Sequence, residues 1–409
     1  MKSPQSNPIA GDSPAPDSHS TEDGGGLRLA IVSRRFWPYA GSTELAAGDL
    51  AGALNRAGHS VDILTIRWEK TWPSYFNYQE SPVRRINRPA TGPWGSYRYL
   101  RNLNQAIDEL NPDGIIVFGL GDEAWSIAKN YDGQIPFVIR IDNHFLGSKT
   151  VQAPLNNHQI ASLTAAKKIL CESEWTAERL RKNPAVNSPN ILPKIVVAPE
   201  PIWIDENHRR TPARQGSSRI AVSDAHPVLM IEPTQPLVVT GAPMNGDNGM
   251  FDLVNAWPHV LKRYPKARLW IFGEGKKSQQ IWDRVNDKHL VSSVIMPGSF
   301  DDLEDVFQAA DLYIHPQRCE ESCSFLARAM ASGLCPIVTD TRATKSLIQH
   351  DTNGFVVNAG DTAALTQAML TTLDNRDLRD RLGRAGARSA ANNYDATKIF
   401  SDFIDVLKV

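Results

Sequence analysis

The sequence has few cysteines, no long apolar run and no excess of charge of either sign. Its cysteines, Cys171, Cys319, Cys323 and Cys335, fit neither a secreted disulfide framework nor a CxxC zinc pair, which favours the reducing cytoplasm. Because no stretch of 18 or more apolar residues occurs, we expect no membrane-spanning helix. Peripheral attachment of an amphipathic surface, at the inner face of a membrane, stays open.

The charge balance argues against a nucleic-acid partner. Lys and Arg number 44 against 45 Asp and Glu, a formal net charge of -1. No cluster of potential metal ligands stands out, so we expect neither a metal nor another cofactor. The 41% hydrophobic and 22% charged residues suit a globular protein, and 409 residues exceed the size of one hydrophobic core. Two domains are therefore expected.

Composition and pattern divide the chain into five segments. Residues 1–26 are rich in Ser, Pro, Asp and Gly and lack the order of a signal peptide, which predicts a disordered tail. We expect a first domain over 27–203, a polar, proline-bearing linker or insertion over 204–235, and a second domain over 236–394. Residues 395–409 predict a C-terminal helix that packs back on the first domain.

Short apolar runs alternate with helical patterns in both predicted domains. The run 27–33 precedes a helical pattern over 44–56, and the run 236–241 precedes another over 250–264. Such alternation indicates parallel sheets with helices on both faces. The predicted class is α/β, with two Rossmann-like doubly wound domains that face a central ligand-binding cleft.

The segment 312–340 carries the most specific pattern. An apolar strand ends before a loop that holds Glu320, and a helix begins near Cys323. Amide groups at Ser322, Cys323 and Ser324 then form a helix N-terminus, where unpaired N–H groups and the helix dipole favour a phosphate. On spacing alone, an ordinary N-cap explains these residues equally well.

Several short motifs follow one another in a fixed order along the chain. In segment 312–340 these are His315-Pro316, Glu320, Ala329-Met330-Ala331, Gly333 and Pro336-Ile337-Val338; elsewhere they are 36–41, 56–61, Asn143-His144, 272–275 and 353–356. In this order they resemble the retaining glycosyltransferases of family 4, from Leu27 to the end of the chain. The resemblance implies the GT-B fold and transfer of a sugar from a nucleotide-activated donor to an acceptor hydroxyl, with retention of anomeric configuration and without a metal.

The resemblance also implies roles for individual residues. Glu320 takes the place of the glutamate that contacts the transferred sugar, and His144 takes the place of a histidine near the reacting carbon. A lone histidine is more often structural, and that interpretation of His144 stays open. Asp142 is the next candidate for a functional residue at this position.

Glycines at strand ends form a second group of candidates. Gly41 and Ser42 fall in a loop that resembles the family's N-terminal glycine loop, where close backbone approach to the donor is expected. Gly273 and Gly275 match a Gly-x-Gly turn after a strand. Plain turn chemistry explains them equally well.

The sequence departs from the family at the positions that hold the donor's ribose and phosphates. Arg328 replaces the second signature glutamate, while Ala242 or Pro243 and Asn248 replace a basic pair. A diphosphate leaving group needs nearby positive charge. The candidates to supply it are Arg328, Arg318, Lys276 and Lys277, although surface cations are usually only solvated.

Arg328 is the strongest of these candidates, because it lies one turn into the helix whose start is the predicted phosphate site. A guanidinium there can bind a phosphate through two hydrogen bonds. The alternative is an ion pair with Glu320 or Glu321.

Two functions therefore remain open at this point. The first is a metal-independent glycosyltransferase of polysaccharide biosynthesis, whose acceptor is a sugar, a lipid-linked molecule or a small molecule. The second is a catalytically impaired relative that keeps the cleft as a binding or scaffold protein. An epimerase or a phosphorylase on the same plan has no clear signature here.

Overall fold

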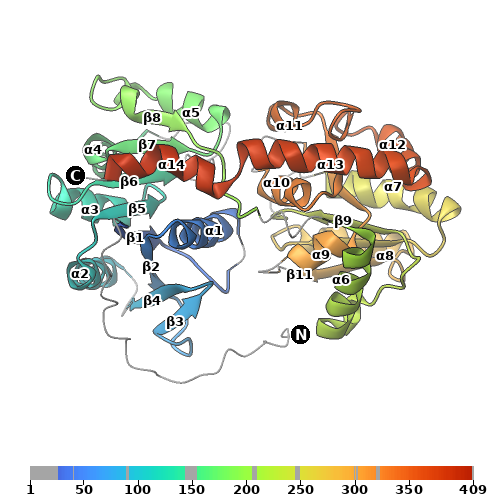
Figure 1. Cartoon of the computed structure of the whole chain (residues 1–409), viewed down its shortest axis with the longest axis horizontal. Coiled ribbons are helices and arrows are strands. Elements are labelled where there is room, and N and C mark those ends of the chain that lie inside the picture. Colours follow the sequence, from blue (N-terminus) through green and yellow to red (C-terminus); the bar gives the residue numbers. More distant parts are fainter. Residues whose placement is uncertain are drawn as a thin grey trace. The chain divides into compact units, whose positions relative to one another are not determined.

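The computed structural model describes residues 26–39, 41–88, 92–142, 154–204, 210–244, 249–298, 300, 303–318 and 323–407. Contacts within the chain separate two compact units (Figure 1). Unit 1 contains the first strand, Thr43–Trp203 and the C-terminal segment from Ala396, whereas unit 2 contains Ala40–Ser42 and Ile204–Asp395. Both units are mixed α/β with a mainly parallel sheet, so the predicted fold class is confirmed.

The sheet of unit 1 has the strand order β3-β4-β2-β1-β5-β6-β7-β8. Its strands are β1 (Arg28–Ser33), β2 (Ser60–Arg67), β3 (Tyr75–Tyr78), β4 (Ser81–Asn87), β5 (Gly114–Phe118), β6 (Phe137–Ile141), β7 (Lys168–Cys171) and β8 (Ile195–Val197). All neighbours pair in parallel except β3 and β4. Strands β5 and β6 are buried along their whole length, as expected of a sheet covered on both faces.

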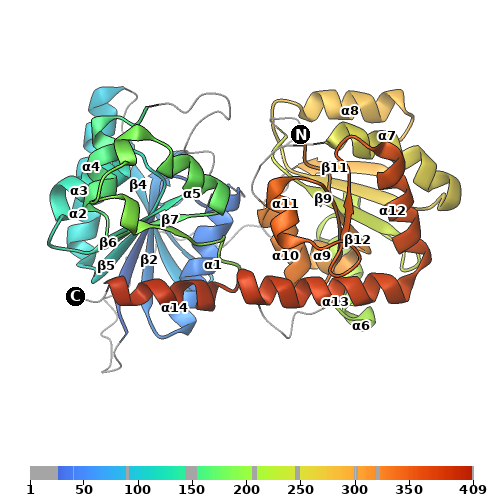
Figure 2. The same cartoon turned by 90° about the horizontal axis from the view of Figure 1, so that it is seen from above.

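Helices cover both faces of this sheet (Figure 2). They are α1 (Ser42–Arg56), α2 (Pro93–Leu110), α3 (Asp122–Tyr131), α4 (Asn157–Ala165), α5 (Glu174–Arg181) and α14 (Ala396–Leu407). In α14, Phe400 and Leu407 are buried in the cluster that contains Leu29 and Leu50. The last helix in the sequence is therefore part of the core of unit 1.

The segment 68–99 contains the hairpin β3–β4 and the start of α2. Gln79 and Glu80 form its two-residue turn, and both have positive φ, 44° and 71°. This turn usually contains Asn or Gly, so the hairpin has no recognisable turn motif in the sequence. Aromatic residues of the hairpin pack internally, since the Trp37 and Phe76 ring centroids are 5.6 Å apart.

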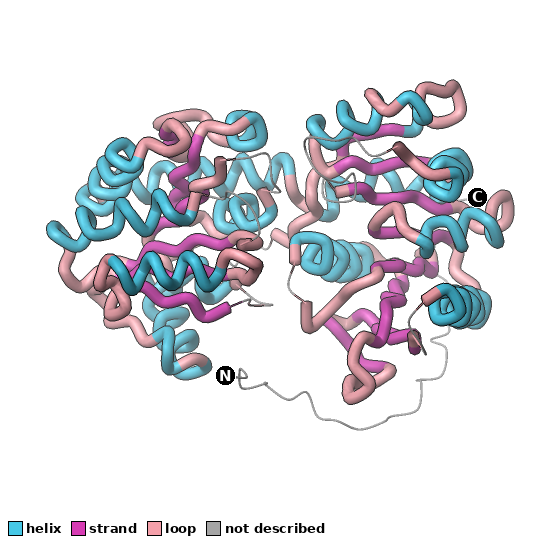
Figure 3. The backbone as a smooth tube through the Cα atoms, turned by 180° about the vertical axis from the view of Figure 1, so that it is seen from behind, coloured by secondary structure: helices cyan, strands magenta, loops and turns pink. Residues whose placement is uncertain are grey.

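The sheet of unit 2 is parallel throughout, in the order β11-β10-β9-β12-β13-β14. Figure 3 draws the strands of both sheets in magenta and the helices in cyan. Its strands are β9 (Leu237–Gly241), β10 (Arg268–Phe272), β11 (Val294–Gly298), β12 (Leu312–His315), β13 (Cys335–Thr339) and β14 (Phe355–Val357). Its helices are α6 (Pro212–Ala225), α7 (Met250–Arg263), α8 (Ser278–Asp287), α9 (Glu304–Ala309), α10 (Ser324–Ala331), α11 (Arg342–Leu347), α12 (Thr362–Asp374) and α13 (Arg376–Asn393). None of the helices that the structure describes is long and apolar enough to cross a membrane.

Helix α6 occupies much of the segment 204–235, which the sequence analysis described as a linker or insertion. It is an integral helix of unit 2, because Ser218 donates a hydrogen bond of 2.8 Å to Asp305 of α9, and Val222 is buried in the core. The buried Arg219 donates to the carbonyl groups of Glu232 and Gln235. The polar residues that suggested an exposed connection thus form a buried network.

Asp311, which directly precedes β12, is the centre of that network. It is 8% exposed and lies within ion-pair distance of three guanidinium groups, Arg219 at 2.9 Å, Arg210 at 3.4 Å and Arg379 at 3.6 Å. Its Oδ2 also accepts the backbone N–H of Leu237 at 2.9 Å. One carboxylate therefore connects α6, α13 and the first residue of β9.

Candidate functional site

The strand order of unit 2 reverses between β9 and β12. From β9 the chain proceeds outward to β10 and β11, and it then returns to β12 on the other side of β9. Loops that leave the carboxyl ends of the two strands diverge at such a point, and ligands of doubly wound sheets bind there. The loop after β9 begins with Ala242 and Pro243, and the loop after β12 leads to α10.

Two glycines allow the loops at this edge to contact one another. Gly249, which precedes α7, has φ 69°, and a Cβ atom on it would lie 1.7 Å from the carbonyl oxygen of Pro316. Gly273, which follows β10, has φ 112°, and its Cβ would lie 2.1 Å from the carbonyl oxygen of Ala242. Only glycine fits at either position. The loops after β9, β10 and β12 are therefore packed backbone to backbone.

Gly275, by contrast, belongs to the start of a helix. Its N–H donates to the Ser278 Oγ at 2.9 Å, which fixes the first turn of α8. The structure thus brings Gly273 and Gly275 to the same sheet edge as α10 and gives each of them a local structural role. Ligand binding by these two residues stays a prediction.

The start of α10 is not capped in the ordinary way by a serine at its N-cap position. Its N-cap residue is Cys323, which makes no side-chain capping hydrogen bond, and Ser324 is already the first helical residue. Cysteine is not among the residues that cap helices well. The side chain of Cys323 therefore does not cap α10, and the N–H groups of a helix start such as this one suit an anion.

Three of the predicted site residues, His144, Glu320 and Ser322, lie outside the described residues. So do Glu321, the proposed alternative ion-pair partner of Arg328, and Asn248, one of the substituted positions. The roles that the sequence suggests for them remain predictions.

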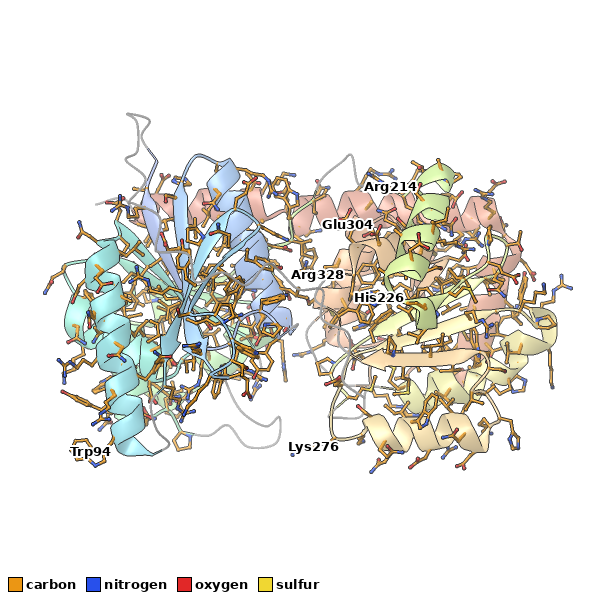
Figure 4. All side chains as sticks on the ribbon, turned by 90° about the horizontal axis from the view of Figure 1, so that it is seen from below. Trp94, Arg214, His226, Lys276, Glu304 and Arg328 are labelled. Carbon is orange, nitrogen blue, oxygen red and sulfur yellow. The ribbon has the colours of Figure 1, made fainter. Side chains whose placement is uncertain are left out.

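Arg328 lies one turn into α10, at the position that the sequence predicted. Its Nε and Nη2 atoms are buried within unit 2. Figure 4 shows Arg328 and Lys276 on the same side of unit 2, although they come from different loops and helices. Arg328 therefore places a guanidinium on the helix whose N-cap residue, Cys323, makes no side-chain capping hydrogen bond.

Arg318, another of the candidate cations, has a carboxylate partner. Its Nε and Nη2 atoms donate to Asp252 at 2.7 and 2.6 Å, a two-point ion pair. Asp252 lies in the first turn of α7, where an acidic residue is common for helix stability alone, so the sequence analysis did not single it out. The pair fixes the loop after β12 to α7 and neutralises the charge of Arg318.

His315 is the last residue of β12, and its side chain is buried. Burial lowers the pKa of its imidazole to about 4, so the ring is neutral near pH 7. Its Nε2 lies 4.0 Å from the Sγ of Cys323, and its carbonyl oxygen accepts the hydroxyl of Thr339 at 3.2 Å. Because the imidazole of His315 is neutral, it adds no positive charge at the start of α10. The positive charge on that helix comes from Arg328.

The buried state of His315 predicts a pH-dependent stability. The unfolded histidine has a pKa of about 6.5, so the unfolded chain binds the proton more tightly, and stability present above pH 6.5 is lost as the pH falls towards about 4. Denaturant titrations should show this loss as a slope of up to about 1.4 kcal/mol per pH unit.

The matched variants are His315→Gln and His289→Gln, the second of which changes an exposed histidine. His315→Gln should flatten the slope between pH 6.5 and 4, and His289→Gln should leave it as in the wild type. An unchanged slope in His315→Gln would show that other groups cause the dependence.

Gly41 and Ser42, which belong to unit 2, lie in the sequence between β1 and the body of α1, with Ser42 as the first helical residue. The hydroxyl of Thr43 donates to Asp142 Oδ2 at 2.6 Å, which joins the start of α1 to the end of β6. Asp142 is 4% exposed, and Arg140 lies 3.4 Å away. These contacts give Asp142 a structural role beside the loop that carries His144.

Known families match both units of the chain. Residues 43–199 match the family described as Glycosyltransferase Family 4, and residues 235–375 match the Glycosyl transferases group 1. The chain belongs to the family 4, or group 1, glycosyltransferases. The resemblance inferred from the short motifs is thereby confirmed, and so is the GT-B fold.

Individual relatives of this family 4 chain match it over different lengths. A phosphatidyl-myo-inositol mannosyltransferase of Mycobacterium leprae is 32% identical over 161 residues, 39% of the chain and 42% of that protein. The chain thus matches less than half the length of this relative. An uncharacterized glycosyltransferase of Haemophilus influenzae is 20% identical over 380 residues, 90% of the chain and 96% of that protein.

Solved structures show the same fold at low sequence identity. Sucrose-phosphate synthase from Thermosynechococcus elongatus has a TM-score of 0.70 and 16% identity, with 93% of this chain and 98% of that chain covered. The Anabaena protein HepE, solved with UDP and glucose, has a TM-score of 0.69 and 15% identity, with 93% and 99% covered. The family 4 chain shares their fold over nearly its whole length.

A metal ion would need several His, Cys, Asp or Glu side chains gathered at one point. Within that part of the chain, no group of three or more His, Cys, Asp and Glu side chains is placed to hold a metal ion.

Proposed function

We propose that this family 4 chain transfers a sugar from a nucleotide-activated donor to an acceptor hydroxyl and retains the anomeric configuration. The observation that carries the proposal is the position of α10. This helix begins at Cys323, beside the strand-order reversal of unit 2, and it carries Arg328 one turn later. Family membership of both halves of the chain supports the same class of reaction.

The donor's phosphates would bind at the first turn of α10. As the bond between the sugar carbon and the diphosphate oxygen breaks, negative charge grows on the departing nucleoside diphosphate. The N–H groups of α10 and the guanidinium of Arg328 would stabilise this charge more strongly than the charge of the intact donor. Glu320 would hold the transferred sugar and His144 would lie near its reacting carbon, as the family resemblance implies.

The donor is proposed to be a nucleoside diphosphate sugar, a class supported by the fold shared with the Anabaena protein that was solved with UDP and glucose. We propose that the reaction requires no metal, since Arg328 and the helix amides supply the positive charge. A sugar, lipid-linked or small-molecule acceptor fits the proposal, within polysaccharide or glycolipid synthesis in the cytoplasm.

A surface of α2 supports a peripheral contact with the inner face of a membrane or with a lipid-linked acceptor. Trp94 is 79% exposed and Tyr97 is 62% exposed (Figure 4). Arg98 and Arg101 are exposed on the same helix. Exposed aromatic rings beside basic residues suit the boundary of an anionic lipid surface.

The decisive experiment measures release of nucleoside diphosphate from a panel of nucleotide sugars, with and without EDTA and with no acceptor present. An enzyme of this class should hydrolyse its own donor slowly. Glu320→Gln should lower that rate by roughly 10²-fold or more, because an interaction with the reacting sugar is lost. The neighbouring Glu321→Gln is the matched control and should stay within about threefold of wild type.

Two other outcomes would count against the proposal. Thermal stabilisation by a nucleotide sugar without any release of nucleoside diphosphate would support the binding or scaffold protein. Loss of the activity in EDTA, with recovery on addition of Mg²⁺ or Mn²⁺, would contradict the metal-independent mechanism.

A further inference from the structure

A pocket of about 380 Å³ lies in unit 2 where the start of α6, the end of α10 and α13 meet. Its volume falls within the range of small-molecule sites. The polar residues of its lining that bear on the argument are Arg210, Thr211, Arg376, Asp380, Arg384 and Arg388.

The pocket lies at the amino edge of the unit 2 sheet, opposite the proposed donor site. Gly333, which lines it, follows the last turn of α10, and the N–H of Arg210 donates to the carbonyl oxygen of Ser332 at 3.1 Å. The eight residues of α10 separate this position from Cys323 at the other end of the helix by about 12 Å. A ligand in the pocket is therefore distinct from the donor's phosphates.

One face of α13 supplies most of the positive charge that lines the pocket. Arg376, Asp380, Arg384 and Arg388 follow one another at intervals of four residues, so they form a single stripe along the helix. Asp380 is paired with Arg210 and with Arg376, each at 3.6 Å. The one carboxylate of the stripe is thus already used twice.

Arg384 and Arg388 remain without a matching charge. Within the described part of the chain, neither guanidinium forms a hydrogen bond or an ion pair, and both side chains are exposed. Like charges four residues apart on a helix repel each other. A helix face adapted only to solvent commonly alternates its charges, whereas this one gathers arginines on the wall of one pocket.

The opposite wall is the start of α6. Thr211 is the N-cap residue of this helix, and Pro212 occupies its first turn. The positive end of the helix dipole therefore faces the same space as the arginines (Figure 4 marks Arg214 in this first turn). Both walls of the pocket favour an anion.

We propose that this pocket binds the phosphoryl group of a small phosphorylated solute. Guanidinium groups match the geometry of phosphate oxygens through paired hydrogen bonds, and Arg384 and Arg388 have donors available for them. The recessed position between three helices suits a solute rather than a flat lipid surface. The site is independent of the proposed transfer reaction and would exist even if the donor were of another class.

The test is a calorimetric titration of the full chain with inorganic pyrophosphate at constant ionic strength. Wild-type protein should bind it saturably, and Arg384→Gln/Arg388→Gln should bind at least tenfold more weakly. The matched control, Arg263→Gln/Arg381→Gln, removes the same charge from two exposed positions of unit 2 outside the pocket and should stay within twofold. Thermal unfolding without pyrophosphate confirms that each variant is folded.

A variant of the proposed donor site and a lipid ligand show whether pyrophosphate binds in this pocket. Binding should persist in Arg328→Gln, which changes the proposed donor site. The proposal is overturned if wild type binds no pyrophosphate, if the control pair weakens binding as much as the pocket pair, or if Arg328→Gln alone abolishes it. Binding to phosphatidate vesicles without binding to pyrophosphate would also overturn it, because the ligand would then be a lipid headgroup.

Discussion

Replacement of Arg328 by glutamine is expected to lower kcat/KM for sugar transfer by about 10²- to 10³-fold. Arg328 stands where the family places a glutamate, on the helix whose first turn is the proposed phosphate site. Because its positive charge would act on the departing diphosphate, most of the loss should appear in kcat rather than in KM. Initial rates of nucleoside diphosphate release with saturating acceptor measure both parameters.

The controls separate a specific role from general electrostatics. Lys276→Gln removes a positive charge from the same side of unit 2 and should change kcat/KM by less than about threefold (Figure 4). Arg328→Lys keeps the charge but not the planar fork, and it should retain an intermediate activity. If Arg328→Glu, which introduces the usual family residue, were as active as wild type, Arg328 would have no role in stabilising the leaving group.

The second large effect is expected on stability. Asp311→Ala should lower the free energy of unfolding by about 3–5 kcal/mol, because it leaves three guanidinium groups near a buried site without their common carboxylate. The variant also removes the acceptor of the Leu237 N–H at the start of β9. Urea denaturation followed by tryptophan fluorescence can measure the change, since Trp257 and Trp270 are buried in unit 2.

The matched control for this variant is Asp351→Ala. Asp351 pairs with Arg381 at 2.9 Å, but its side chain is 61% exposed. Exposed pairs of this kind contribute about 0–1 kcal/mol. A similar effect of the two substitutions would mean that the buried network around Asp311 adds nothing beyond a surface ion pair.

The regular elements could be predicted from the sequence because their apolar residues have clear periods. The runs 236–241 and 312–315 are continuous and apolar, as in a parallel sheet covered on both faces, and both are strands. Hairpin β3–β4 was missed, since its turn uses Gln79 and Glu80 in place of the glycine or asparagine that signals such a turn. Helix α6 was missed because its buried Arg219 resembles a surface residue in composition.

The candidate site was predicted less completely, for a physical reason. The start of α10 and Arg328 are close in sequence, so one local motif could indicate both. Arg318 and Asp252 are 66 residues apart, and only the fold shows that they form an ion pair. The arginines of α13 have the spacing of a solvated helix face, and the sequence alone gave no sign of a pocket beside them.

The division of the chain also has a consequence for the order of folding during synthesis. The segment Ile204–Asp395, which makes up nearly all of unit 2, is synthesised before α14, whereas unit 1 needs α14, whose buried Phe400 and Leu407 complete its core. The N–H of Ala396 donates to the carbonyl oxygen of Ile202 at 3.0 Å, so the chain rejoins unit 1 where it left it. During synthesis, unit 1 therefore emerges from the ribosome first but can complete its core only after α14 has been made. Until then, the apolar face that α14 covers stays exposed.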